Sequence, residues 1–432
     1  MVTRTFAADH ITPVRAYASL RSHAPGRSSF LLEAEPGTQG ERFSIVGYRV
    51  KTESLYPGGG NALDLLEQDL ASDDVADTFP ERLSQALVGY IAYDVTHAML
   101  GIDPWPDETD VARLMRDATV AVFDHAKQTM TIAGRTKGAV ERCAWEMTHG
   151  PDLPAMAVPD ANARPEFLEP TISDTSYTLK AKRALSYIEG GEAKSVVLGR
   201  GFRSPLRGAD PFDIYRALRV LSPARYHFFL EFGEMPMAEG IAIAGAADEV
   251  LVEGPSRIEP LREKFPASSV VGEPKKRAAE IIRELEVGSR RAWGGVVGYA
   301  VPGGSFELTV ARVAVIARRG FLEVTGAAEL AKGLAPEAGT EATWTDARAA
   351  FAAIRAAHDS AKVREAADEA RRAKEEAAER AKAEAEANAA VAGEQSATVG
   401  GEQSAAVAGE QSATVGGEQS FPADQGEDSG AR

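Results

Sequence analysis

The sequence predicts an α+β fold, because short strand-like runs alternate with helical segments along most of the chain. Hydrophobic residues make up 44% of the 432 residues and charged residues 26%, which is ordinary for a globular protein with a packed core. A chain of this length exceeds what one simple core usually covers, so we expect two structured regions or one elaborate layered domain.

The charge and the cysteine count exclude several classes of protein. The net charge of −16 disfavours nucleic acid as a partner, since phosphate backbones would repel the chain. Cys143 is the single cysteine, so an intrachain disulfide is impossible. The N-terminus has no apolar signal segment, and no stretch approaches the roughly 18 apolar residues of a membrane span. We therefore expect a soluble cytoplasmic protein without a membrane partner.

Residues 1–150 are expected to form a mixed region of strands and helices. Phe30–Glu33 is a short apolar run, followed by a turn with Gly and Pro and by a second run at residues 42–48, so the two predict paired strands. Apolar spacing predicts a helix over Asn61–Leu70. Further strands are expected at Leu87–Tyr93, Thr119–Phe123 and Thr129–Ile132.

Residues 151–170 form the expected linker, because prolines recur there without apolar periodicity. The second region, residues 171–360, opens with a predicted helix over Ser173–Glu189 that ends at Gly190-Gly191. Further expected elements are a strand at Ser195–Leu198, a helix at Phe212–Leu221, strands at Tyr226–Phe232 and Ile241–Val252, a helix at Lys275–Leu285, and a hairpin of Gly294–Ala300 with Glu307–Ala317.

The last part of the chain has a different composition. Residues 361–390 are rich in Ala, Glu, Lys and Arg with few large apolar side chains, which predicts an exposed charged helix. In residues 391–432 the sequence Gly-Glu-Gln-Ser recurs every eight residues, beginning at Gly393. Such a segment lacks the apolar residues that offset ordering entropy, so we expect a disordered tail.

Several short motifs occur in the order in which they occur in one enzyme family. They are Leu31-Leu32-Glu33, Gly89-Tyr90-Ile91-Ala92-Tyr93-Asp94, Val196-Val197-Leu198, Asp210-Pro211-Phe212, Ser222-Pro223, Gly272-Glu273-Pro274-Lys275, Gly294-Gly295-Val296-Val297-Gly298-Tyr299 and Arg312. Over roughly residues 10–356 the chain resembles anthranilate synthase component I, a chorismate-utilising enzyme.

The resemblance implies a fold of facing antiparallel sheets with outer helices, here truncated. It also implies a lyase reaction of tryptophan biosynthesis, in which chorismate and ammonia give anthranilate and pyruvate. In that family glutamates hold a magnesium ion, a histidine helps the hydroxyl group leave, and a glutamine amidotransferase subunit supplies the ammonia.

The chain departs from the family pattern at two places. After Val252 the family has a long block with a substrate loop, a glutamate pair and the active-site histidine, and this block is missing. Gly339 and Ala342 stand where the second glutamate pair is expected, while nearby Glu337 and Glu341 have a different spacing. We therefore expect no metal cofactor and impaired catalysis, as in a pseudoenzyme, with the catalytic residues unassigned.

Three residues resemble family positions that contact the substrate. Arg312 corresponds to an arginine that grips a chorismate carboxylate, although a surface or strand-pairing arginine is the alternative. Trp293 replaces a tyrosine, and Gly326 keeps one of two glycines that approach the substrate, while Ala328 replaces the other. The expected substrate-binding residues are thus Arg312, Gly326 and Trp293.

Glu33 and Tyr226 resemble parts of the family's pocket for feedback inhibition by tryptophan. Neighbouring positions differ from the family, so we expect only a remnant of that pocket. Three hypotheses remain open: a working subunit, a non-catalytic paralogue that binds a partner subunit or an aromatic small molecule, and a decaying copy that scarcely folds.

Overall fold

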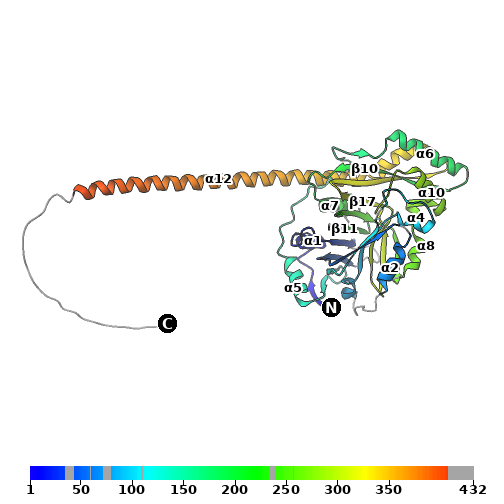
Figure 1. Ribbon diagram of the computed structural model, residues 1–432, viewed down its shortest axis with the longest axis horizontal. Helices are drawn as coiled ribbons and strands as arrows, with labels where there is room; N and C mark the ends of the chain where they lie inside the picture. The colour runs from blue at the N-terminus through cyan, green and yellow to red at the C-terminus, as the bar shows by residue number, and fades with distance from the viewer. Residues whose placement is uncertain are drawn as a thin grey trace, which may run out of the picture. The chain divides into compact units, whose positions relative to one another are not determined.

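A computed structural model describes residues 1–34, 43–58, 60–71, 79–108, 110–233, 239–255 and 257–406. The chain divides into two units, residues 1–363 and residues 364–432. In Figure 1 the first unit contains the labelled sheets and the helices that cover them. Arg42, the start of the second expected strand, and residues 407–432 of the expected tail lie outside the described residues.

The first unit is built on two antiparallel sheets. The large sheet has the order β1 (Val2–Ala7), β8 (Thr129–Gly134), β7 (Thr119–Asp124), β3 (Phe43–Tyr48), β2 (Ser29–Ala34), β11 (Tyr226–Phe232), β12 (Ile241–Ala247), β17 (Val313–Arg318), β18 (Phe321–Ala331), β10 (Ser195–Pro205) and β14 (Gly272–Glu273), with β9 (Glu169–Pro170) beside β10. The six-stranded sheet has the order β13 (Val250–Pro255), β16 (Ser305–Val310), β15 (Val296–Ala300), β5 (Leu87–Ile91), β6 (Asp110–Arg116) and β4 (Thr52–Pro57).

The two sheets face each other across a shared core. Phe30 and Phe228 of the large sheet pack with Val88 and Val297 of the six-stranded sheet. Side chains alternate along a strand, so Leu31, next to Phe30, points to the opposite face and packs with the outer helices. This arrangement confirms the expected fold of facing antiparallel sheets.

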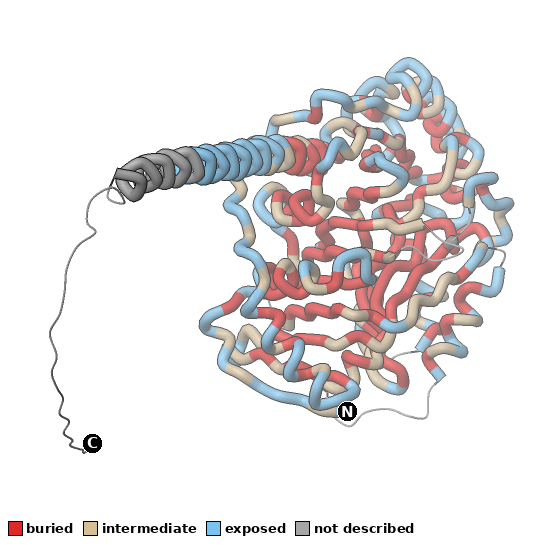
Figure 2. The backbone as a smooth tube through the Cα atoms, turned by 60° about the vertical axis from the view of Figure 1, so that its left-hand side comes forward, coloured by how far each residue is buried: buried red, intermediate tan, exposed pale blue. Residues whose placement is uncertain are grey.

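Helices cover the outer faces (Figure 1). On one side lie α1 (Pro13–Ser22), α5 (Lys137–Glu146) and α7 (Pro211–Leu221). On the other lie α2 (Ala62–Leu70), α4 (Val95–Leu100), α8 (Ile258–Lys264), α9 (Ser268–Val271) and α10 (Lys275–Leu285). Helix α6 (Asp174–Glu189) packs on β10, β18 and α11 (Pro336–Asp346). The remaining helices are α3 (Phe79–Leu83) and α12 (Arg348–Ala406). Figure 2 shows that the buried residues of this unit are concentrated in the strands, and that the helices contribute further buried residues.

Local chemistry fixes where these helices begin. The side chain of Asp210 accepts a hydrogen bond from the backbone N–H of Phe212, and Pro211 occupies the first turn of α7. The Ser173 hydroxyl accepts from the N–H of Ser176 at the start of α6. Both starts agree with the helices expected from the sequence.

Two expected strands are each divided between the sheets. The chain leaves the large sheet after β12 and enters the six-stranded sheet as β13, so the strand expected over residues 241–252 is two strands. Residues 307–317 likewise divide into β16 and β17. The backbone N–H of Val310 donates to the carbonyl of Glu249 (2.8 Å) where the two crossings meet. Arg312 lies between β16 and β17 at this point.

Both sheets contain strands from before and after the expected linker, so residues 1–363 form one compact unit. Residues 151–168 contain no helix or strand. Strand β13 is the outer strand of the six-stranded sheet, and its pairing with β16 is interrupted by a bulge between Val250 and Val252.

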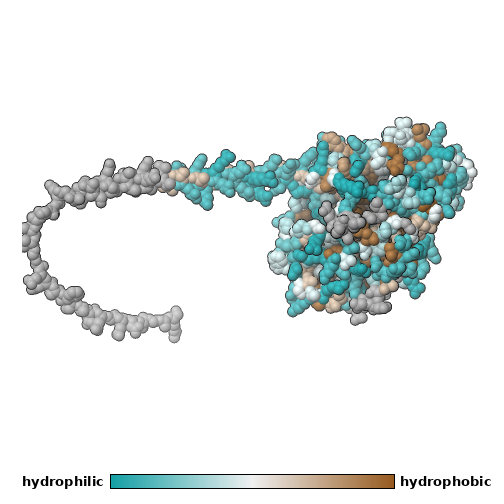
Figure 3. Space-filling view, viewed as in Figure 1, coloured by the Kyte–Doolittle hydropathy of each residue, from teal (hydrophilic) through white to brown (hydrophobic). Residues whose placement is uncertain are grey.

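The second unit, as far as it is described, is the continuation of α12 to Ala406. Residues 364–389 of this helix are almost entirely exposed, and Figure 3 shows their surface as mostly hydrophilic. The helix extends past residue 390, where the tail was expected to begin. No helix within the described residues is long and apolar enough to cross a membrane.

Candidate functional site

Strands β10 and β18 separate two regions of the candidate site. They pair antiparallel, with Gly201 opposite Thr325 and Gly199 opposite Ala327. A Cβ atom added at Gly326 would lie 2.1 Å from the carbonyl oxygen of Thr343 on α11. A Cβ atom added at Gly199 would lie 3.0 Å from the carboxylate of Glu286, on the opposite face. The strand pair therefore has one face against α11 and one face toward the loop that follows α10.

The face toward α11 is closely packed. Thr343 covers Gly326, and a side chain at Gly339 would meet Leu330 at 2.8 Å. These two glycines let α11 approach β18, which gives Gly326 a packing role in this structure. Its expected contact with a substrate stays a prediction.

Arg312 is held by groups of the protein itself. Its guanidinium donates to the carbonyl of Ser269 (2.6 Å) and pairs with the carboxylate of Asp346 at 3.2 Å. Asp346 also accepts the backbone N–H of Ala327 at 2.9 Å, so one carboxylate at the end of α11 joins Arg312 to β18. The expected grip of Arg312 on a substrate carboxylate stays a prediction; in this structure its carboxylate partner is Asp346.

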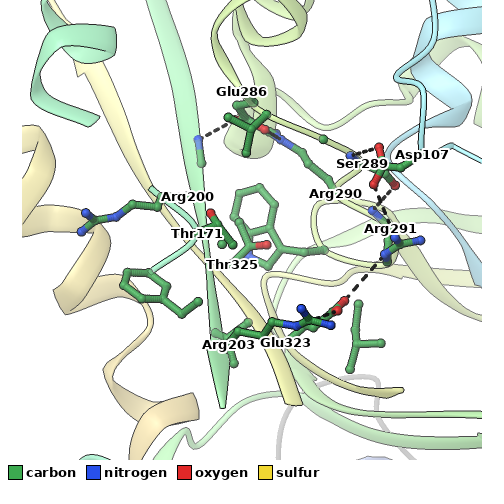
Figure 4. Close-up of a pocket in the computed structure, with 18 of the residues that line it drawn as sticks. Asp107, Thr171, Arg200, Arg203, Glu286, Ser289, Arg290, Arg291, Glu323 and Thr325 are labelled. Atoms are coloured by element: carbon green, nitrogen blue, oxygen red, sulfur yellow. Dashed lines mark hydrogen bonds and ion pairs between the residues drawn. The ribbon is translucent and has the colours of Figure 1, made fainter. Parts of the chain in front are cut away.

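The other face of the strand pair opens on a cavity of about 350 Å³. Strands β10, β17 and β18 form its floor, and residues 286–293 form a wall (Figure 4). Trp293, one of the expected binding residues, lines this cavity and is almost completely buried. The apolar lining also includes Ile172 and Ile316.

The wall of the cavity is anchored by a buried ion pair. Glu286 accepts two hydrogen bonds from one edge of the Arg290 guanidinium, from its Nε and Nη2 atoms, and Arg290 also donates to the carbonyls of Val197 (2.7 Å) and Val270 (2.6 Å). Glu286 further accepts the backbone N–H of Gly199 at 2.5 Å. Both side chains are buried. Each guanidinium nitrogen of Arg290 donates a hydrogen bond, and each carboxylate oxygen of Glu286 accepts at least one, so we assign this pair a structural role.

Asp94 holds the same wall in place through hydrogen bonds from residues 289–291. Its carboxylate accepts the backbone N–H groups of Arg290 (3.1 Å) and Arg291 (3.0 Å) and the hydroxyl of Ser289 (2.5 Å). Burial raises the pKa of Asp94 to about 6. The Tyr93-Asp94 motif therefore holds the loop that carries two cavity arginines.

Six arginines line the cavity, against three carboxylates. Arg290 is paired as described, and Arg200 points away toward Asp174 and Thr343. The other four are Arg203, Arg291, Arg318 and Arg319. Sequence reasoning missed them, although the doublets at 290–291 and 318–319 were a visible signal.

A magnesium ion does not fit the residues of this cavity. Its carboxylates, Asp107, Glu286 and Glu323, each lie beside an arginine, and the positions expected for glutamates on α11 are Gly339 and Ala342. Glu337 and Glu341 are exposed. Across the described ranges, the only group of three or more residues with metal-ligand spacing is Asp94, His97 and Glu108, and none of these lines the cavity.

The two residues expected in the regulatory remnant do line a common cavity, of about 60 Å³, between the sheets. Tyr226 of β11 pairs with Ala34 of β2, which places it beside Glu33. The carboxylate of Glu33, however, accepts from the hydroxyl of Tyr215 (2.5 Å) and pairs with Arg219 (2.6 Å). Its charge is therefore balanced by α7, and a regulatory role stays a prediction.

Comparison with known proteins agrees with this architecture. The profile of a family described as chorismate binding enzyme matches residues 27–255 and 250–330, in two segments that meet in β13. Anthranilate synthase component 1 of Thermus thermophilus is 26% identical, covering 81% of this chain and 97% of that protein. The Streptomyces coelicolor protein of the same name is 26% identical, covering 82% and 89%.

Solved structures give the same fold. Anthranilate synthase component I of Streptococcus pneumoniae superposes with a TM-score of 0.60 at 19% identity, covering 81% of this chain and 99% of that one. The menaquinone-specific isochorismate synthase of Escherichia coli gives 0.54 at 13% identity, covering 82% and 95%.

The alignments also locate the lost segment. The alignment with the Thermus thermophilus protein extends over 454 positions but includes only 81% of this 432-residue chain, so long gaps open in this chain. The two profile segments meet where the sequence predicts the missing block. The chain therefore belongs to the chorismate binding enzyme family, as a divergent relative of anthranilate synthase component I with an internal deletion after Val252.

Proposed function

We propose that this protein keeps the fold of anthranilate synthase component I and a ligand cavity, but does not convert chorismate to anthranilate. The observation that carries the proposal is the packing of α11. Asp346 engages Arg312, the candidate carboxylate-binding arginine, and α11 brings no carboxylate toward the cavity.

The charge of the cavity supports the same proposal. A dianionic substrate that is bound through magnesium needs a set of free carboxylates to hold the ion. Here the lining carboxylates lie beside arginines, so their charge is balanced already. Loss of a metal and of a general acid together typically costs many orders of magnitude in rate.

The direct test is an assay of the purified full chain with chorismate, magnesium and ammonium at alkaline pH, followed by anthranilate fluorescence. We expect no product above a mock preparation purified from the same host. Anthranilate synthase component 1 of Thermus thermophilus, assayed alongside, shows that the conditions support turnover. Anthranilate formation in proportion to the amount of this protein would overturn the proposal and restore the family's ordinary lyase activity in tryptophan biosynthesis.

A glutamine amidotransferase partner, expected from the resemblance, is a separate proposal. The relatives are named as components, which supports a multisubunit origin. Co-expression with the amidotransferase subunit from the same organism, followed by size-exclusion chromatography, tests it: a stable complex is expected if the partner surface has been retained.

A further inference from the structure

The arginines at one end of the cavity have fewer carboxylate partners than their charge requires. Glu323 is the carboxylate nearest to Arg203 (3.6 Å) and lies 3.7 Å from Arg291, so it is shared between two guanidinium groups. Arg291 has a second partner, Asp107, at 3.4 Å. All of these distances are longer than a strong charge-assisted hydrogen bond, which is about 2.7 to 2.9 Å.

Arg318 stands next to this group and is the least satisfied of them. One terminal nitrogen pairs with Glu239 at 2.8 Å, but Glu239 also pairs with Arg319 at 2.6 Å. The Nε–H of Arg318 is buried and has no partner among the described residues, and the side chain is only 8% exposed. A buried donor without an acceptor costs free energy comparable to a lost hydrogen bond.

The electrostatics point the same way. Burial lowers the pKa of Arg318, and the nearby positive charges of Arg291 and Arg319 lower it further, in spite of Glu323 and Glu239. An arginine that is buried among other arginines is stabilised by any anion that reaches it. In Figure 4, Arg203, Glu323 and Arg291 converge at one end of the cavity, whereas Glu286 and Arg290 form their closed pair at the other.

We propose that this cavity binds a small organic carboxylate, with Arg203, Arg291 and Arg318 around the carboxylate group. Guanidinium groups match the planar carboxylate and bind it with two parallel hydrogen bonds. The ring or hydrocarbon body of the ligand lies against Trp293 and Ile316 in the apolar part of the lining. A volume of about 350 Å³ is at the small end of ligand pockets, which fits one substituted ring.

The inference deepens the proposed function and rests on it in one respect: the ligand is held and not converted. Neither Arg312 nor a metal takes part, because Arg312 is engaged by Asp346 and does not line the cavity. Binding is therefore expected without magnesium.

The test is isothermal titration of the full chain, at low ionic strength, with benzoate, with its neutral analogue benzamide and with inorganic phosphate. We expect saturable binding of benzoate that is unchanged by magnesium or by EDTA, at least tenfold weaker binding of phosphate, and none of benzamide. Equal affinity for benzoate and benzamide, or for benzoate and phosphate, would overturn the assignment. Absence of saturable benzoate binding would overturn it as well.

Variants assign the binding to these arginines. Arg291→Gln and Arg318→Met are each expected to weaken benzoate about tenfold or more, as for the loss of charge-assisted hydrogen bonds. Arg203→Gln, a change at a half-exposed side chain that leaves the core intact, should weaken it several-fold. The matched control is Arg183→Gln, because Arg183 is exposed, lies 3.8 Å from a carboxylate and is outside the cavity.

Unchanged thermal unfolding midpoints establish that each variant is folded. Full retention of benzoate affinity in Arg203→Gln and Arg291→Gln would refute the site. The titration is independent of the turnover assay. Anthranilate formation together with arginine-dependent benzoate binding would refute only the proposed function. Absence of both anthranilate formation and benzoate binding would refute only the carboxylate site.

Discussion

The two faces of strand β18 meet different surroundings. On one face, α11 lies directly on Gly326, and Asp346 closes the contact by binding both Arg312 and the backbone of β18. On the other face, the side chains meet a cavity that holds more arginines than carboxylates. The deletion has thus not left a uniform void: half of the candidate site is filled by the protein, and half is open with unbalanced charge.

This difference separates residues that act through packing from residues that act through ligand binding. Side chains on the closed face should affect stability without affecting a ligand, whereas Arg203, Arg291 and Arg318 should do the reverse. The ion pair of the cavity wall is the exception on the open face, because its hydrogen bonds are complete. Substitutions on the two faces test this division, and the largest effect is expected at the cavity wall.

Glu286→Gln should cause the largest loss of stability. It leaves the guanidinium of Arg290, which is 2% exposed, without a countercharge, and breaking a buried ion pair in this way costs about 3 to 5 kcal/mol. Urea unfolding measures the change. The control is Glu284→Gln, an exposed carboxylate 3.8 Å from Arg183, with an expected loss below about 1 kcal/mol. Similar losses in both variants would show that the wall is not anchored by this pair.

Gly326→Val tests the closed face. The new side chain would collide with the backbone of α11, and overpacking of this kind costs about 1 to 3 kcal/mol or more. Gly138→Ala in α5 is the control, since no atom lies within 4 Å of its added Cβ and helix propensity favours alanine by about 0.5 to 1 kcal/mol. A Gly326→Val protein as stable as the unsubstituted chain would mean that α11 is not packed on β18.

Asp94 makes the stability of the cavity wall depend on pH. Burial raises its pKa from 3.8 to about 6, so between these values the folded state binds the proton more tightly than the unfolded state. The contribution of Asp94 to stability therefore falls as pH rises from about 4 to about 6, by on the order of 3 kcal/mol, and is constant above that range.

The comparison with Asp94→Asn isolates this effect. Unfolding free energies of both proteins are measured from pH 4 to pH 7. The free energy of the unsubstituted protein minus that of the variant should become smaller as the pH rises from 4 to 6. A difference that is independent of pH would show that Asp94 titrates at its ordinary pKa.

Asp346→Asn should have the smallest effect. The amide oxygen can still accept from Ala327, and Arg312, which is partly exposed, can be hydrated when its ion pair is lost, so we expect a loss of about 1 kcal/mol. Benzoate affinity should stay unchanged in the Asp346→Asn protein, whereas it should fall in Arg291→Gln. A large change in benzoate affinity would mean that the closed face also contributes to binding.

Much of the fold could be predicted from the sequence, because apolar periodicity and capping residues act locally. The helices at Asp174–Glu189 and Pro211–Leu221 agree closely with the expectation, since Ser173 and Asp210 mark their starts. The division of residues 241–252 and 307–317 between two sheets was not predicted. Apolar alternation continues through each crossing, and only the pairing partners show that the sheet has changed.

The candidate site was less predictable than the fold. Trp293 was expected to bind the substrate because its neighbours Gly294 and Gly295 belong to a recognisable motif; it lines the cavity, and its binding role stays a prediction. Arg318 and Arg291 come from different strands and loops, and their proximity depends on tertiary structure. The partner of Arg312, Asp346, was likewise missed, because it lies 34 positions further along the chain.

Strand β13, at which the family block is lost, is also an outer strand, and no other strand among the described residues pairs with its free side. Such an edge can recruit a strand from another molecule and begin aggregation. This edge carries three features that oppose recruitment: the bulge after Val250, the charge of Glu253 and the proline at 255. The six-stranded sheet thus ends on this side in a strand that is poorly suited to intermolecular pairing, which would allow the protein to remain dispersed at high concentration.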